Sequence, residues 1–109
     1  MIKLTVKNIK EIEESFHEAI TTICDEKKEY YETLFKNYSK DLNLEVIFTK
    51  DGKNYKTSAS LNMKTKKLLL VETGKDPLKV LTRLCSEFKK TAKRQYDLER
   101  KDYEYKRKR

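Results

Sequence analysis

The last third of the chain begins with a clear helix start and then contains no helix breaker. Gly74 ends the preceding segment, Asp76 is a good N-cap and Pro77 suits the first helical position. No further glycine or proline follows before Arg109. Periodicity predicts regular helix to about Arg100 and a frayed end beyond it. The apolar residues of this helix share one arc that should face a sheet: Leu81, Leu84, Cys85, Phe88 and Ala92.

Four strands are predicted before this helix, three from alternating apolar and polar residues and the fourth because the turn at Lys64-Thr65-Lys66 leads into it. The first is at 2–6, where Ile, Leu and Val alternate with polar residues. The other three are at 42–48, 55–63 and 67–72, and an Asp-Gly turn signal at 51–52 separates the first two of them. Because their connections are short, these three strands should form an antiparallel meander.

A second helix is predicted between the first and second strands. Asn8 followed by Glu11 resembles a capping box, and apolar residues at helical spacing continue to about Phe35. The order is therefore β-α-β-β-β-α, an α+β fold in which a four-stranded, mainly antiparallel sheet carries two helices on one face, as in double-stranded-RNA-binding domains. We expect a single domain over residues 1–100 and a basic C-terminal tail over 101–109.

Positive charge is concentrated at one end of the chain. The formal net charge is +8 and the isoelectric point is about 9.4, a balance that favours polyanionic partners. Residues 89–109 contain ten Lys and Arg against four Asp and Glu, a net charge of +6, which leaves +2 for residues 1–88.

On a helical wheel, the basic residues of the last helix gather opposite its apolar arc. The stripe runs about 32 Å from Lys79 to Arg100, and it can follow a phosphate backbone and gain affinity by releasing counterions. An ordinary solvated face would carry mixed charges, whereas Glu87 and Asp97 only interrupt this one. The predicted phosphate contacts are Lys79, Arg83, Lys89, Lys90, Lys93 and Arg94, supported by Arg100 and Lys101.

The aromatic residues favour core packing over base stacking. A base-stacking sheet needs exposed aromatics on adjacent strands, but Phe48 and Tyr55 belong to the core-facing sets. The junction between helix and sheet should be filled by Tyr30, Tyr31 and Phe35. Stacking or snorkelling in the basic tail stays open for Tyr96, Tyr103 and Tyr105.

Residues that could support catalysis are few and badly placed. His17 is the only histidine, which excludes a multi-histidine metal centre, and Cys24 on the same helical face would lie about 10 Å away. Two glycines are too few for a phosphate-cradling loop. We therefore expect no enzyme, no cofactor, no metal and no small-molecule substrate.

The sequence also predicts the compartment. No apolar run approaches the roughly 20 residues of a membrane span, and no signal-peptide pattern opens the chain. We expect a cytoplasmic protein with no membrane contact and with reduced thiols at Cys24 and Cys85. A disulfide between them stays open if the two helices pack together.

The element order, with TGKDPLKVLTRL leading into FKKTAKRQY, resembles the ribosome hibernation promoting factor family (sigma-54 modulation proteins), which includes the ribosome-associated inhibitor A type. LFKNYSKD entering LNLEVIF is similar to the family's passage from helix to strand. The family's turn, apolar and basic positions are matched by Gly74, Asp76, Leu78, Leu81, Leu84, Lys90 and Arg94. Glu87 departs from the pattern, since the family usually has a basic residue there. The resemblance is to the short form, without the dimerising C-terminal domain, and with a basic rather than an acidic tail.

The resemblance implies a non-enzymatic protein that binds the small ribosomal subunit and its ribosomal RNA in stress or stationary phase. It would occupy the messenger RNA and tRNA region at the A and P sites and block translation, and we expect a monomer when free. Two alternatives stay open: a general structured-RNA-binding domain of the double-stranded-RNA-binding type, and a protein-interaction module. The strand at 2–6 counts against the first, because such domains begin with a helix.

Overall fold

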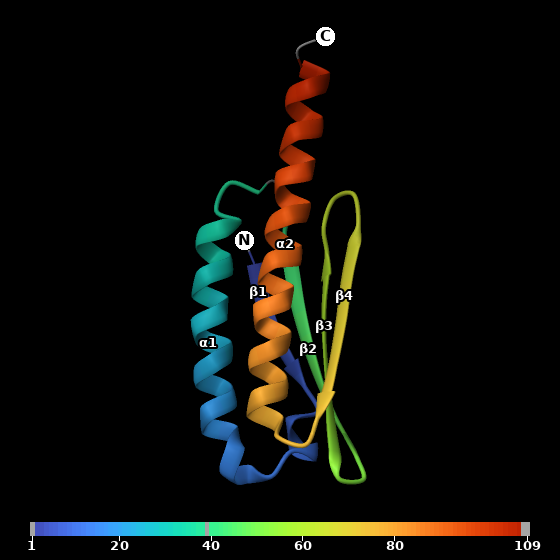
Figure 1. The fold of residues 1–109 in the computed structure, drawn as a ribbon. Helices are drawn as coiled ribbons and strands as arrows, with labels where there is room; N and C mark the ends of the chain where they lie inside the picture. Colours follow the sequence, from blue (N-terminus) through green and yellow to red (C-terminus); the bar gives the residue numbers. More distant parts are fainter. Residues whose placement is uncertain (1, 39, 108–109) are drawn as a thin grey trace.

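The computed structural model of the chain describes residues 2–38 and 40–107, with side chains to residue 100. Its elements follow the predicted order β-α-β-β-β-α, with two short 3-10 helices inserted before the first α-helix (Figure 1). They are β1 (Ile2–Lys7), η1 (Ile9–Glu11), η2 (Glu14–Phe16), α1 (His17–Leu34), β2 (Leu42–Asp51), β3 (Asn54–Asn62), β4 (Lys67–Gly74) and α2 (Pro77–Arg107).

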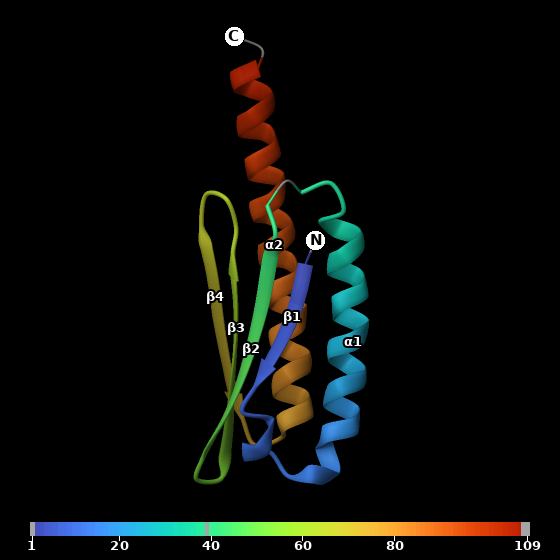
Figure 2. The same ribbon diagram turned by 180° about the vertical axis from the view of Figure 1, so that it is seen from behind.

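The sheet has the strand order β1-β2-β3-β4. β1 pairs with β2 in parallel, and the other two pairings are antiparallel. Parallel neighbours need a crossover connection, which α1 supplies. Both helices lie on the same face of the sheet (Figures 1 and 2). The predicted α+β fold with a mainly antiparallel sheet is confirmed.

The core lies between this face of the sheet and α2. Leu44, Leu61 and Leu68 are opposite one another on β2, β3 and β4, and all three are buried. They share one apolar cluster with Phe88 and Ala92 of α2. Of the predicted sheet-facing residues of α2, four are buried and Cys85 is half-buried. Removing this apolar surface from water holds α2 against the sheet.

Aromatic residues fill the junction between the helices and the sheet, as predicted. Tyr31 and Phe35 are buried, and Tyr30 is half-buried against the same cluster. The ring centroid of Tyr31 lies 6.2 Å from that of Phe35 and 6.4 Å from that of Phe88. The strand aromatics Phe48 and Tyr55 are also buried, so they are not available for base stacking.

The start of the first helix differs from the prediction. Asn8 adopts a left-handed conformation (φ 62°) and its side chain forms no capping hydrogen bond, so the capping-box prediction is wrong. Ile12 is extended and only 2% exposed, and the α-helix begins at His17. Long-range contacts hold this segment: Glu13 accepts hydrogen bonds from Lys50 Nζ and Tyr55 OH, both at 2.5 Å. His17 Nε2 donates to the Ile12 carbonyl at 2.8 Å, which gives the single histidine a structural role.

The last helix is longer than predicted, because it ends at Arg107 rather than near Arg100. An ion pair between Arg100 and Asp97, 3.3 Å long, lies on the last turn whose side chains are described. The division into a domain over 1–100 and a tail over 101–109 stays a prediction. The side chains of Tyr103 and Tyr105 lie outside the described part of the chain.

We predict that Phe88→Ala lowers the free energy of unfolding by about 3–5 kcal/mol, since it leaves a cavity between α2 and the sheet. Leu98→Ala is the control, because Leu98 is 53% exposed, and it should change stability by less than about 0.5 kcal/mol. Denaturant titration measures both values. Losses of similar size in the two variants would contradict the packing described here.

The hydrogen bonds from Lys50 and Tyr55 lower the pKa of Glu13 from 4.5 to about 2. A carboxylate with a lowered folded-state pKa stabilises the fold above its unfolded-state pKa, and this contribution disappears as it protonates. The stability difference between the wild type and Glu13→Gln should therefore be full above about pH 4.5 and vanish near pH 2. Urea titrations across this pH range measure this stability difference. Glu14→Gln, which also removes one carboxylate, is the matched control. A difference that does not change with pH would contradict the prediction.

Candidate nucleic-acid interface

The predicted basic residues lie along the surface of α2. All of those with described side chains are exposed: Lys79, Arg83, Lys89, Lys90, Lys93, Arg94 and Arg100. Lys101 also belongs to α2, but its side chain lies outside the described part. Because the core fixes the opposite side of the helix, these cations stand at set positions on a rigid element. That they contact phosphates stays a prediction.

Two of the cations pair with acidic residues of the same helix. Lys90 Nζ lies 3.8 Å from Glu87, and Arg100 Nη2 lies 3.3 Å from Asp97. Exposed pairs of this kind are worth about 0–1 kcal/mol, so a polyanion can compete with them. Lys79, Lys93 and Arg94 form no ion pair within the described part of the chain. These three are the cations most available to a ligand.

Arg83 and Lys89 mark the two margins of this surface. Arg83 Nη2 donates to the Thr73 carbonyl of β4 at 3.0 Å. On the other side, Lys89 Nζ lies 4.4 Å from the ring centroid of Tyr30 in α1. The predicted stripe is therefore a broad surface that extends from the edge of β4 to α1.

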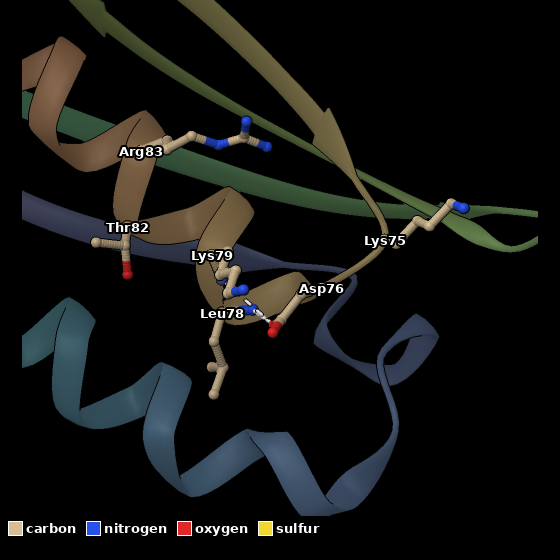
Figure 3. Close-up of a pocket in the computed structure, with 6 residues that line it drawn as sticks. All are labelled: Lys75, Asp76, Leu78, Lys79, Thr82 and Arg83. Atoms are coloured by element: carbon tan, nitrogen blue, oxygen red, sulfur yellow. Dashed lines mark hydrogen bonds between the residues drawn. The ribbon is translucent and has the colours of Figure 1, made fainter.

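An open hollow of about 550 Å³ lies at the start of α2 (Figure 3). Asp76 Oδ1 accepts hydrogen bonds there from the backbone N–H groups of Leu78 at 2.9 Å and Lys79 at 3.3 Å, which confirms the predicted N-cap. Lys75, Lys79 and Arg83 bring three cations to its lining. The sequence analysis did not include Lys75, although its position directly before the N-cap could have indicated that it lies beside this helix end.

Gly74 allows β4 and α2 to approach closely at this hollow. A Cβ atom at this position would lie 2.9 Å from both Arg83 Nη2 and Val80 Cγ2, closer than real contacts allow. Any larger residue would displace Arg83 from the Thr73 carbonyl or push α2 away from β4. Gly74, which the sequence predicted to end a strand, therefore also helps to position Arg83, one of the predicted cations.

The two cysteines are free thiols, and both line a small cavity between the helices and the sheet. Burial raises the pKa of Cys24 to about 12 and also raises that of Cys85. Such thiols are poor nucleophiles at neutral pH. The described residues contain no cluster of three or more metal-ligating side chains, and none of their helices is long and apolar enough to span a membrane.

Comparison with known proteins shows a shared fold. No protein-family description matches the chain, and no curated protein matches its sequence. The chain is similar to the crystal structure of the Protein Y N-terminal domain from Thermus thermophilus, with a TM-score of 0.57, 15% identity and coverage of 85% of this chain and 96% of that one. A ribosomal subunit interface protein from Coxiella burnetii matches with a TM-score of 0.54 and 14% identity, over 89% and 97% of the two chains. At these identities the likeness establishes the fold.

Asp76 offers a test of how this end of α2 is built. Asp76→Ala should lower the free energy of unfolding by about 1 kcal/mol through loss of the N-cap, whereas Asp76→Asn should keep it. Both variants remove a carboxylate beside Lys75 and Lys79, so both should elute later from a heparin column, which serves as a polyanion. Thermal unfolding and the salt concentration at elution are the measurements. Equal destabilisation by both variants would contradict the capping role.

Proposed function

We propose that this chain is a short member of the ribosome hibernation promoting factor family that binds the small ribosomal subunit through the basic face of α2. In stress or stationary phase it occupies the messenger RNA and tRNA region at the A and P sites and blocks translation. Two matches support this proposal, because a Protein Y N-terminal domain and a ribosomal subunit interface protein share the fold over almost their whole lengths.

The observation that carries the proposal is the presentation of exposed cations on a helix whose other face is buried. Lys79, Lys93 and Arg94 project from a helix that Leu81, Leu84 and Phe88 hold against the sheet. Because the backbone that carries these cations is already ordered, only their side chains lose freedom on binding, which favours affinity. Steric blocking of this kind requires tight binding and no chemistry.

The interface suits recognition of phosphates and shape rather than of bases. Phosphate contacts position a protein without reading sequence. The sheet aromatics Phe48 and Tyr55 are buried, and Tyr96 packs against Phe35 with 5.2 Å between ring centroids. A single structured RNA, such as the RNA of the small subunit, is therefore a better partner than varied single strands.

Protein–protein association is a second candidate function, and one observation favours it. Leu69 and Val71 of the edge strand β4 are 61% and 45% exposed. Exposed apolar residues on a sheet edge can pair with another chain. Binding to a partner that survives nuclease treatment and high salt would point to this function instead.

Charge reversal on α2 tests the proposed function. Lys90→Glu with Arg94→Glu should weaken co-sedimentation with purified small ribosomal subunits at least about tenfold, or about 1.4 kcal/mol, because two phosphate contacts become repulsive. Lys53→Glu with Lys56→Glu makes the same change in net charge on the β2–β3 hairpin and should bind normally. Both double variants should melt like the wild type. Unchanged sedimentation of the α2 variant at moderate salt would rule out the assignment.

A further inference from the structure

The turn between β3 and β4 carries a second group of cations, separate from those of α2. The segment MKTKK at 63–67 contains Lys64, Lys66 and Lys67, and all three side chains are exposed. The turn lies beside the second half of α2, at the other end of the sheet from the β2–β3 turn (Figures 1 and 2). It is therefore far from the hollow that contains Lys75 and Lys79.

Hydrogen bonds fasten this turn to α2. Glu99 Oε2 accepts from the Thr65 backbone N–H at 3.3 Å and from its hydroxyl at 2.9 Å. Gln95 Nε2 donates to the same hydroxyl at 2.7 Å. Tyr38 OH donates to Glu99 Oε1 at 2.5 Å and accepts the backbone N–H of Lys64 at 2.8 Å. Lysines on a free hairpin would be mobile, whereas these project from a turn held at two points.

The hydrogen bonds of this network stabilise the negative charge of Glu99. Partial burial acts to raise its pKa, but the hydrogen bonds from Tyr38, Thr65 and Gln95 outweigh burial and leave the pKa below its usual range. The carboxylate is thus an ionised anchor whose oxygens are already occupied by donors. The hydrogen bonds of Glu99 hold the turn in place, and the exposed side chains of the turn lysines stay available to a ligand.

The turn and α2 also meet around one pair of aromatic rings. The ring centroids of Tyr38 and Tyr96 are 5.4 Å apart. Lys64 Nζ lies 5.2 Å from the centroid of Tyr38, and Arg100 Cζ lies 5.0 Å from that of Tyr96. Lys64 of the turn and Arg100 of α2 therefore flank the same pair of aromatic rings. The cation–π contacts restrict the movement of both side chains.

We propose that the β3–β4 turn, held on α2 by Glu99, forms with Arg100 a second site for nucleic-acid phosphates. This site rests on the proposed function. It adds a second RNA contact to the one on the basic face of α2. Lys79 and Arg100 are about 32 Å apart along α2, so the hollow and the turn site reach phosphates that lie far apart on an RNA. Two linked contacts raise affinity because the second forms at high effective concentration.

Neutralising the turn lysines tests the site. Lys66→Ala with Lys67→Ala should weaken binding to purified small ribosomal subunits and should lower the slope of log affinity against log salt by about one to two, since up to two phosphate contacts are lost. Lys53→Ala with Lys56→Ala removes the same charge from the turn at the opposite end of the sheet. This control should leave both affinity and slope unchanged.

A neutral substitution tests the role of the anchor. Thr65→Val keeps every charge but removes the hydroxyl that joins the turn to Glu99 and Gln95. It should weaken binding while the melting temperature of the remaining fold changes little, because Thr65 is exposed. Wild-type affinity for Thr65→Val would overturn the claim that α2 positions the turn.

The outcomes separate this site from the proposed function. If Lys66→Ala with Lys67→Ala binds like its control while Lys90→Glu with Arg94→Glu fails, the turn site is wrong and the ribosomal assignment stands. If the wild type ignores small subunits but binds a plain RNA duplex, and only the turn variant weakens that binding, the ribosomal assignment is wrong and the phosphate site stands.

Discussion

Burial of one face of α2 against β3 and β4 determines where every other functional group of the protein can lie. Val80, Leu81 and Leu84 are almost completely buried, so the helix has no freedom to rotate about its axis. Arg83, the charged residue between them in sequence, must then face solvent. Apolar packing thus supplies the precision that an electrostatic interface cannot provide by itself, since attraction between exposed charges has little directional preference.

Two hydrogen-bond networks, each centred on one carboxylate, fix the two ends of the sheet in the same way. At one end Glu13 joins the segment before α1 to the β2–β3 hairpin, and at the other Glu99 joins the β3–β4 turn to α2. Each carboxylate accepts hydrogen bonds from a tyrosine hydroxyl and from at least one other donor. In a chain with so many exposed charges, these satisfied carboxylates set the path of the loops that the core does not reach.

An element could be predicted from the sequence wherever the contacts that determine it are close in sequence or follow a regular period. Asp76 and the apolar arc of α2 were predictable because a cap and a helical face depend on residues within a few positions. The start of α1 was not, because the residues that bind Glu13 lie 37 and 42 positions away. The turn lysines were missed for the same reason, since Thr65 meets Glu99 across 34 positions.

Glu87, the acidic residue among the predicted cations, has a place that reconciles it with a polyanion interface. It lines a groove beside β4 together with Val71 and Arg83, at the margin of the basic surface rather than at its centre. Its exposed pairing with Lys90 is weak, so that lysine can exchange it for a phosphate. An acid at this margin lowers the positive potential beside β4, and among the described residues it forms no ion pair with Lys79, Lys93 or Arg94. Glu87, the residue that departs most from the basic pattern, is therefore compatible with the proposed interface and would limit its width.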